Sequence, residues 1–206
     1  MFELLLPELR RKSIHLTGAL IPAVYYFIDR ETAIVFLSII NAVLLVVEWL
    51  RLHGKLNFPE MLIRPHEKKQ VAAYIYFQLA ALFTILVFDK TIAIAALFML
   101  AFGDAASGIA GAAVRGGNVR QETGRWIKPL PIIAVMFSVC TATWVILMNL
   151  PHAPDMKVLS PGVYFMGALG ATLGDAVHLR IIGKPVDDNL VIPVLASIFM
   201  TISSSG

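Results

Sequence analysis

The sequence predicts an all-α protein, a polytopic transmembrane helix bundle of about seven spans with its N-terminus in the cytoplasm. Of its 206 residues 58% are hydrophobic and 15% are charged, whereas soluble domains are about 45–50% apolar and about 25% charged. The apolar residues gather in runs that approach the roughly 20 residues that a helix needs to cross a bilayer. Lys and Arg are concentrated in alternate connections between these runs. We therefore expect residues 1–206 to form a single integral membrane domain.

Seven apolar segments are the predicted spans, and polar or turn residues separate each from the next. The first follows Arg11 and Lys12 without a small-residue cleavage site, so we expect a helix there rather than a cleaved signal peptide. The first and last segments are short and need tilt or local thinning of the bilayer. Six spans with one re-entrant segment is the alternative. The predicted spans are Ile14–Ile28, Thr32–Leu50, Val71–Phe88, Thr91–Val114, Leu130–Leu150, Pro161–Ile182 and Asn189–Ser203.

The basic residues predict the orientation of the chain. With seven crossings, 14 of the 17 Lys and Arg residues fall on the side of the N-terminus, and only Arg30, Lys90 and Lys157 fall on the other. Cytoplasmic loops carry an excess of Lys and Arg, so we expect cytoplasmic polar loops and a C-terminus outside. The favoured location is a prokaryotic cell membrane, or the endoplasmic reticulum if the protein is eukaryotic.

Several kinds of site are excluded by the motifs. A single cysteine, Cys140, rules out an internal disulfide framework and a Cys-based zinc site. The five histidines lack the spacing of a zinc-binding helix motif, and neither a P-loop nor a dinucleotide-binding glycine motif occurs. The net charge of +3 reflects topology, so we expect no nucleic-acid partner.

Two aspartates lie inside apolar segments, where a charged side chain is costly and usually functional. Asp104 and Asp175 each stand in a Gly-Asp-Ala sequence, about 14 residues from the predicted outer end of the helix. At about 1.5 Å per residue, both carboxylates are expected in the cytoplasmic third of the membrane. Helical spacing puts Ser107 and Gly111 on the face of Asp104. We predict two helices that face one site, although an internal repeat, or pairing of each aspartate with a nearby arginine, also fits.

A third acidic group, Asp187, Asp188 and Asn189, precedes the last predicted helix. Asp and Asn are common helix N-caps, so capping alone would account for them. With Asp104 and Asp175 they also form an acidic set on the side of the basic loops. Carboxylate oxygens suit Mg²⁺, which often bridges substrate phosphates. The set predicts a Mg²⁺–polyphosphate site with Asp104, Asp175 and Asp188 as metal ligands.

Four short segments, spread from residue 11 to about residue 200, form an ordered series. They are Arg11-Lys12-Ser13-Ile14-His15, Arg64-Pro65-His66-Glu67, the glycine-rich stretch from Gly103 to Gly111, and Asp187-Asp188-Asn189-Leu190-Val191-Ile192-Pro193. This series resembles the CTP-dependent lipid-alcohol kinases, which include dolichol, polyprenol and phytol kinases and the yeast-type CTP-dependent diacylglycerol kinase. These kinases are more distantly similar to the phosphatidate cytidylyltransferases.

The resemblance implies a membrane-embedded kinase that transfers the γ-phosphate of a nucleoside triphosphate, preferably CTP, to a lipid hydroxyl. The lipid would be a polyprenol- or dolichol-type alcohol or diacylglycerol, and the reaction would need Mg²⁺ at the cytoplasmic face. Asp104 and Asp175 would be catalytic. The residues implied to bind nucleotide phosphates are Arg11, Lys12, Arg64, Ser107, Gly111, Arg125 and Lys128, and the supporting residues are His15, Glu67, Asp187 and Asn189.

One motif departs from the family pattern. Members usually carry Lys-Ser/Thr-x-x-Gly after the Gly-Asp helix, whereas Lys128-Pro129-Leu130-Pro131 keeps only the lysine. The hydroxyl and the glycine that the family motif offers to phosphates are missing, so the sequence leaves CTP versus ATP open.

Three other functions compete with the kinase. A cytidylyltransferase that forms a CDP-lipid would use the same donor and metal but would attack the α-phosphate. A small transporter would also place aspartates inside helices, and a non-catalytic scaffold would not depend on them. The Gly- and Ala-rich helix faces leave a homodimer open.

Overall fold

The computed structural model describes residues 2–56, 69–115, 127–151, 153, 155–177, 179–181 and 184–205. Within these ranges the chain consists of helices joined by turns and irregular segments, with one hairpin of two two-residue strands and one isolated bridge. The elements are α1 (Phe2–Leu16), the 3₁₀ turn η1 (Thr17–Ala19), α2 (Leu20–Phe27), α3 (Arg30–Leu52), α4 (Ala73–Val87), α5 (Lys90–Phe98), the π-helical turn η3 (Met99–Gly103), α6 (Asp104–Arg115), α8 (Leu130–Met148), α9 (Pro161–Ala176), β1 (Arg180–Ile181), β2 (Lys184–Pro185) and α10 (Asp188–Ser204).

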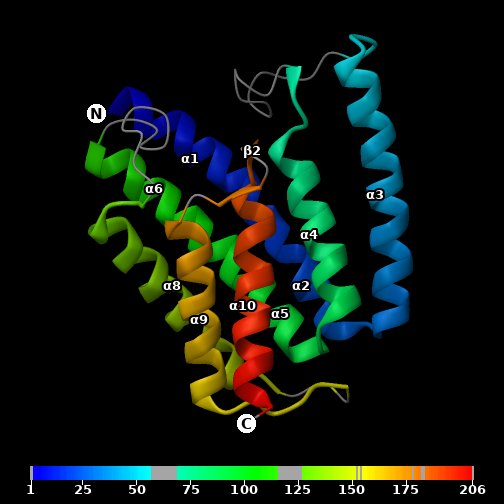
Figure 1. Cartoon of the computed structure of the whole chain (residues 1–206). Helices are drawn as coiled ribbons and strands as arrows, with labels where there is room; N and C mark the ends of the chain where they lie inside the picture. Colours follow the sequence, from blue (N-terminus) through cyan, green and yellow to red (C-terminus); the bar gives the residue numbers. More distant parts are fainter. Residues whose placement is uncertain are drawn as a thin grey trace.

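The all-α prediction is confirmed, and the described helices form a bundle whose two chain ends lie at opposite ends (Figure 1). Three helical segments are long and apolar enough to cross a membrane: Arg30–Leu52, Lys90–Val114 and Leu130–Met148. Ala73–Val87 and Asp188–Ser204 are apolar but shorter. Helix length therefore supports three spans, and the larger number of seven stays a prediction.

The predicted boundaries are wrong at two spans. The first predicted span begins at Ile14, but the helix begins at Phe2 and passes through η1 into α2. The sixth was expected to reach Ile182, but α9 ends at Ala176. The next residues form the antiparallel β1–β2 hairpin, in which Arg180 pairs with Pro185. The helix stops because the backbone turns extended at Val177, whose φ and ψ are −105° and 127°.

The rod formed by α5, η3 and α6 lies at the centre of the bundle. In its apolar window 67% of the residues are buried, against 22% for α3 and 28% for α8. Every residue from Lys90 to Leu97 is buried. Helix α3 lies at the outside of the bundle and packs against α4 (Figure 1). Its exposed side chains are largely apolar, as in a helix in contact with lipid.

Helices α9 and α10 approach each other closely through two glycines. A Cβ atom on Gly170 would lie 2.6 Å from the Leu195 carbonyl oxygen, and one on Gly174 would lie 3.0 Å from Ile192 Cα. The contact is therefore backbone against backbone, as expected for glycines four residues apart in membrane helices. This packing fixes the end of α9, where Asp175 lies.

A buried ion pair joins the end of α3 to the start of α4. Glu48 and Arg51 are 3% and 8% exposed, and Arg51 Nε and Nη2 each donate to the Glu48 carboxylate at 2.7 Å. The same carboxylate accepts the Ala72 N–H at 2.8 Å and the Tyr74 hydroxyl at 2.7 Å. Arg51 also donates to the Gln70 carbonyl at 2.6 Å. One carboxylate thus holds both ends of the connection between the two helices.

Glu48→Ala is expected to destabilise the protein by about 3 kcal/mol, because it leaves the buried Arg51 guanidinium without its carboxylate. Thermal unfolding of the purified protein in detergent would measure the loss. Glu31→Ala is the matched control, since Glu31 is exposed in the first turn of the same helix. Equal unfolding temperatures for Glu48→Ala and Glu31→Ala would contradict a stabilising role for this ion pair.

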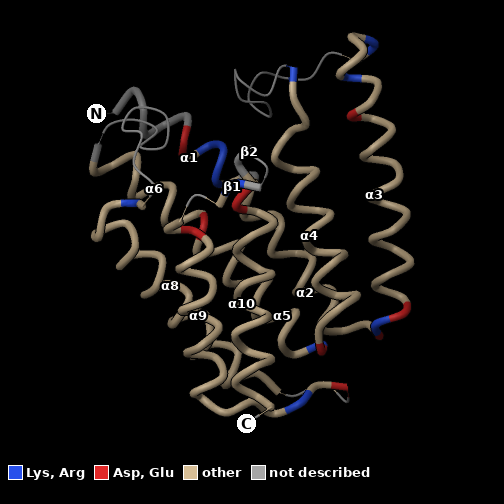
Figure 2. Tube along the Cα trace, in the orientation of Figure 1, with Lys and Arg blue, Asp and Glu red and all other residues tan. Residues whose placement is uncertain are grey.

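Charged residues gather at the two ends of the bundle, and the tube between them is almost entirely uncharged (Figure 2). At the end of the bundle that carries the N-terminus, these charged residues come from α1, the last turn of α3 and the residues around β1 (Figure 2). At the opposite end Asp29, Arg30, Asp89, Lys90 and Lys157 flank the starts of α3 and α5. The described part of the chain therefore has two polar ends separated by an apolar middle.

Candidate functional site

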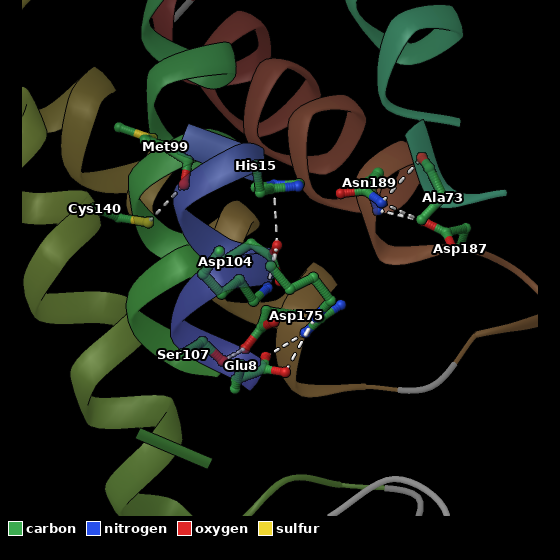
Figure 3. Close-up of polar contacts among 12 residues, drawn as sticks. Glu8, His15, Ala73, Met99, Asp104, Ser107, Cys140, Asp175, Asp187 and Asn189 are labelled. Carbon is green, nitrogen blue, oxygen red and sulfur yellow. Dashed lines mark hydrogen bonds and ion pairs between the residues drawn. The ribbon is translucent and has the colours of Figure 1, made fainter. Parts of the chain in front are cut away.

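Polar side chains from four parts of the chain meet near the end of the bundle that carries the N-terminus, and Figure 3 shows those of α1, α6 and α9. They come from α1, from α6, from the residue pair before α8 and from the end of α9. Asp104 begins α6 directly after the π-helical turn η3, a local irregularity that is frequent at functional sites. Asp175 lies in the last turn of α9.

Asp104 forms a hydrogen-bonded ion pair with Lys12 of α1, and His15 of the same helix lies beside it without the geometry of a hydrogen bond. Lys12 Nζ donates to Asp104 Oδ2 at 2.6 Å, and His15 Nε2 lies 3.0 Å from the same oxygen (Figure 3). Lys12 is 3% exposed and Asp104 is 9% exposed. The His15 ring also stacks edge-on against Phe77, with ring centroids 5.0 Å apart. The spacing of Lys12 and His15 on one helix thus brings both onto one carboxylate oxygen.

Lys12 reaches Asp104 by lying across Gly108, one turn further along α6. A Cβ atom on Gly108 would lie 2.2 Å from Lys12 Cε and 2.9 Å from Glu8 Oε1. A side chain at this position would collide with the aliphatic part of the lysine. The small residues that follow Asp104 therefore make room for α1.

Asp175 is paired with Lys128 and Ser107. Lys128 Nζ lies 2.5 Å from Asp175 Oδ1, and the Ser107 hydroxyl donates to Asp175 Oδ2 at 2.7 Å. Lys128 Nζ is also 3.2 Å from Ser107 Oγ. The backbone holds Lys128 in place as well, because its N–H donates to the Ala176 carbonyl at 3.0 Å and Ile127 forms a bridge with Val177.

The two pairs explain how an apolar bundle tolerates buried carboxylates. A buried ion is costly unless an opposite charge and hydrogen bonds compensate it, and each aspartate has its own lysine. The partners are lysines rather than the arginines that sequence reasoning considered. Asp104 lies 14 residues after Lys90 and Asp175 lies 14 residues after Pro161, the first residues of their rods, so the predicted equal depth agrees with the helix starts.

The third acidic group lies at the start of α10. Asp187 caps this helix by accepting the Asn189 N–H at 3.0 Å, as the capping interpretation expects. Asn189 Nδ2 donates to Asp187 Oδ1 at 2.8 Å and lies 3.5 Å from the Ala73 carbonyl oxygen of α4 (Figure 3). Asp188 is buried. These residues connect α10 to α4.

The predicted metal ligands do not form one cluster. Among the described residues no group of three or more His, Cys, Asp or Glu side chains is close enough to hold a metal ion. Mg²⁺ commonly takes one or two protein carboxylates and completes its shell with phosphate oxygens and water. Asp104 fits that smaller role, because among the described residues only its Oδ2 has partners and its side chain is 12% exposed.

Of the remaining predicted site residues, two are described by the structure and three lie outside the described residues. Arg11 is in an ion pair with Glu8 on its own helix, its Nε donating to Glu8 Oε2 at 3.1 Å, and Gly111 is buried on α6. Arg64, Glu67 and Arg125 lie outside the described residues, so their predicted roles stay predictions.

Sequence reasoning missed two acidic residues that the structure brings into ion pairs. Glu8 lies beside Gly108 and pairs with Arg11. Their spacing of three residues on one helix is the sequence pattern that indicates this ion pair. Glu48 stands in an apolar stretch, as Asp104 does, and the intramembrane-charge argument would have selected it. Its place three residues before Arg51 points to a local ion pair.

Comparison with family models, with curated proteins and with solved structures finds no match to this chain.

Proposed function

We propose that this protein is an integral membrane lipid kinase, which transfers the γ-phosphate of a nucleoside triphosphate to the hydroxyl of a lipid alcohol. The observation that carries the proposal is the pair of buried lysine–aspartate contacts, Lys12–Asp104 and Lys128–Asp175, at one polar end of an apolar bundle. Carboxylates and lysines side by side are what a reaction on a charged phosphate needs. The motif order that resembles the CTP-dependent lipid-alcohol kinases supports the same reaction class.

The location of the pairs suits a reaction between a lipid and a soluble nucleotide. They lie near the end of the bundle where α1 and most basic residues are found (Figure 2), while the apolar faces of α3 and α8 stay exposed. A lipid hydroxyl at the bilayer surface and a nucleotide from the aqueous side could both reach such a place. We propose CTP as donor, and a polyprenol- or dolichol-type alcohol or diacylglycerol as acceptor.

In the proposed reaction the lipid hydroxyl oxygen forms a bond to the γ-phosphorus, and the bond from that phosphorus to the β–γ bridging oxygen breaks. The hydroxyl proton passes to Asp104, and the nucleoside diphosphate leaves. Lys12 and Lys128 would bind phosphate oxygens, and Arg11 would add a planar guanidinium suited to two parallel contacts. His15, 3.0 Å from Asp104 Oδ2, would hold that carboxylate in place.

Mg²⁺ is the proposed cofactor, and Asp104 is the described residue that best fits it. The ion would neutralise negative charge on the phosphates, and the lysines of the chain would neutralise only part of that charge. Asp188 and Asp175 were also predicted as ligands, but neither joins Asp104 in a three-carboxylate group among the described residues. The proposal is therefore a site of one carboxylate completed by phosphate oxygens and water.

We propose that the end of the bundle with the N-terminus faces the cytoplasm, since that side carries most of the Lys and Arg residues. Lys55→Cys and Ser205→Cys test it, because both positions are exposed and lie at opposite ends. The natural Cys140 is fully buried and should not react. In intact cells a membrane-impermeant maleimide is expected to label Ser205→Cys but not Lys55→Cys. Labelling of Lys55→Cys alone would reverse the orientation.

A transfer assay tests the function itself. The purified protein would be incubated in lipid nanodiscs with Mg²⁺, with CTP or ATP labelled at the γ-phosphate, and with a panel of polyprenols and diacylglycerol. We expect the label in the lipid fraction with at least one alcohol, faster with CTP than with ATP, and none after chelation of Mg²⁺. Absence of labelled lipid with every combination would overturn the kinase proposal.

A further inference from the structure

The two Gly-Asp-Ala aspartates have the same sequence context but different surroundings. Asp175 is fully buried, and both of its carboxylate oxygens are used, Oδ1 by Lys128 and Oδ2 by Ser107. Asp104 is also buried, with 12% of its side chain exposed, and Lys12 and His15 both approach Oδ2. Within the described ranges Asp104 Oδ1 has no partner. Among the described residues, both oxygens of Asp175 therefore have hydrogen-bond partners, whereas only Oδ2 of Asp104 has one.

The backbone around Asp175 is built to hold Lys128. Asp175 lies in the last turn of α9, where the helix dipole disfavours a negative charge, so the carboxylate depends on its lysine. The residues that follow Asp175 bind the backbone of that lysine and of the residue before it, through the bond from the Lys128 N–H to Ala176 and the Ile127–Val177 bridge. Side chain and main chain therefore fix Lys128 together.

Ser107 connects this arrangement to the other aspartate. It lies three residues after Asp104 on α6, is 1% exposed, and donates to Asp175 across the helix contact. Its oxygen is also 3.2 Å from Lys128 Nζ. The hydroxyl sets the distance between α6, which carries Asp104, and the lysine held by α9.

We propose that the two aspartates have different roles: Asp104 binds the metal and the substrate, whereas Asp175 is a positioning residue that holds Lys128 for the polyphosphate. This inference rests on the proposed function and makes it specific. It assigns the divalent cation to one aspartate and the phosphate charge to the lysine of the other. Equal roles for the two motifs, as their sequences suggest, are thereby rejected.

Binding measurements separate the two roles without any need for turnover. Mn²⁺ alone would be titrated by electron paramagnetic resonance, and tripolyphosphate alone by calorimetry, with the full-length protein in nanodiscs. Asp104→Asn is expected to weaken Mn²⁺ binding at least about tenfold. Asp175→Asn is expected to leave Mn²⁺ binding unchanged and to weaken tripolyphosphate binding about tenfold, the effect of losing one charged hydrogen bond.

A double-mutant cycle tests whether Asp175 acts through Lys128. Lys128→Met should weaken tripolyphosphate binding as much as Asp175→Asn, and the double variant should be no weaker than either single variant. The double variant also removes a whole buried ion pair, which proteins tolerate better than loss of one partner. If the Asp175→Asn loss adds in full to that of Lys128→Met, the positioning role is wrong.

Ser107→Ala provides a milder variant that keeps both charges. It should weaken tripolyphosphate binding and leave Mn²⁺ binding as in the parent. Loss of Mn²⁺ binding in Asp175→Asn or Ser107→Ala equal to that in Asp104→Asn would overturn the inference, as would a parent protein that binds neither probe. Failure of the kinase proposal looks different, since the two probes would still separate the aspartates while no labelled lipid is formed.

Discussion

Replacing Asp104 with asparagine is expected to lower the rate of phosphoryl transfer about a thousandfold, because the variant loses the carboxylate that binds Mg²⁺ and accepts the hydroxyl proton. Asparagine keeps the size of the side chain and can still accept a hydrogen bond from Lys12. The initial rate of lipid phosphate formation, measured at saturating nucleotide, gives the effect on the chemical step. The unfolding temperature, measured in the same preparation, separates this effect from loss of fold.

Asp89→Asn is the matched control for Asp104→Asn. Asp89 precedes the first residue of the same helical rod, is half exposed and pairs with Lys157 at 2.8 Å at the opposite end of the bundle. Its loss should leave the rate as in the parent, since exposed ion pairs contribute less than about 1 kcal/mol. If Asp104→Asn retains the rate of Asp89→Asn, the reaction does not use the Lys12–Asp104 pair, and the proposed mechanism is wrong.

The second large effect is expected at Gly170. Gly170→Val should destabilise the protein by about 3 kcal/mol, because its Cβ would lie 2.6 Å from the Leu195 carbonyl oxygen, a clash with backbone that only a shift of α9 against α10 would relieve. The loss of Asp175 geometry that follows should also lower activity. Thermal unfolding in detergent measures the first effect, and the lipid phosphate assay measures the second.

Gly162→Val tests whether space at Gly170 is the cause. Gly162 belongs to the same helix, but a Cβ atom there would meet nothing nearer than Ser160 Oγ at 3.8 Å. This variant should unfold within a few degrees of the parent. Similar destabilisation of Gly162→Val and Gly170→Val would show that helix propensity, and not close packing of α9 on α10, explains the result.

Much of the candidate site follows from the sequence, because a carboxylate in an apolar stretch has few ways to be tolerated. A charged side chain inside a membrane is energetically costly, and this predicts Asp104 and Asp175 as functional residues. The small residues around Asp104 have a visible role, since Lys12 lies across Gly108. The pairing itself could not be predicted. Which lysine meets which aspartate depends on contacts between α1 and α6 and on the bridge before α8, and no local pattern encodes them.

The same limit explains the errors at the helix ends. Hydropathy predicts where apolar residues lie but not where hydrogen bonding changes, so the extension of α1 to Phe2 and the hairpin after Ala176 were missed. Glu48 lies inside the predicted span Thr32–Leu50 whereas its partner Arg51 lies just beyond it, so the predicted spans separate two residues that the structure pairs on one helix. Helix lengths support three spans, while the shorter helices pack in the same bundle. Packing against neighbours, which a sequence window does not register, decides how short a buried helix can be.

The most direct test of the lipid kinase uses CTP that carries different phosphorus isotopes at its α and γ positions. The protein in nanodiscs would be given this nucleotide with Mg²⁺ and, in parallel reactions, the preferred lipid alcohol or the monophosphate of that alcohol. Both isotopes would be counted in the extracted lipid. The kinase predicts that only the γ isotope enters the lipid, with CDP as the other product. Entry of the α isotope with release of pyrophosphate would instead identify a cytidylyltransferase, and entry of neither would contradict the account.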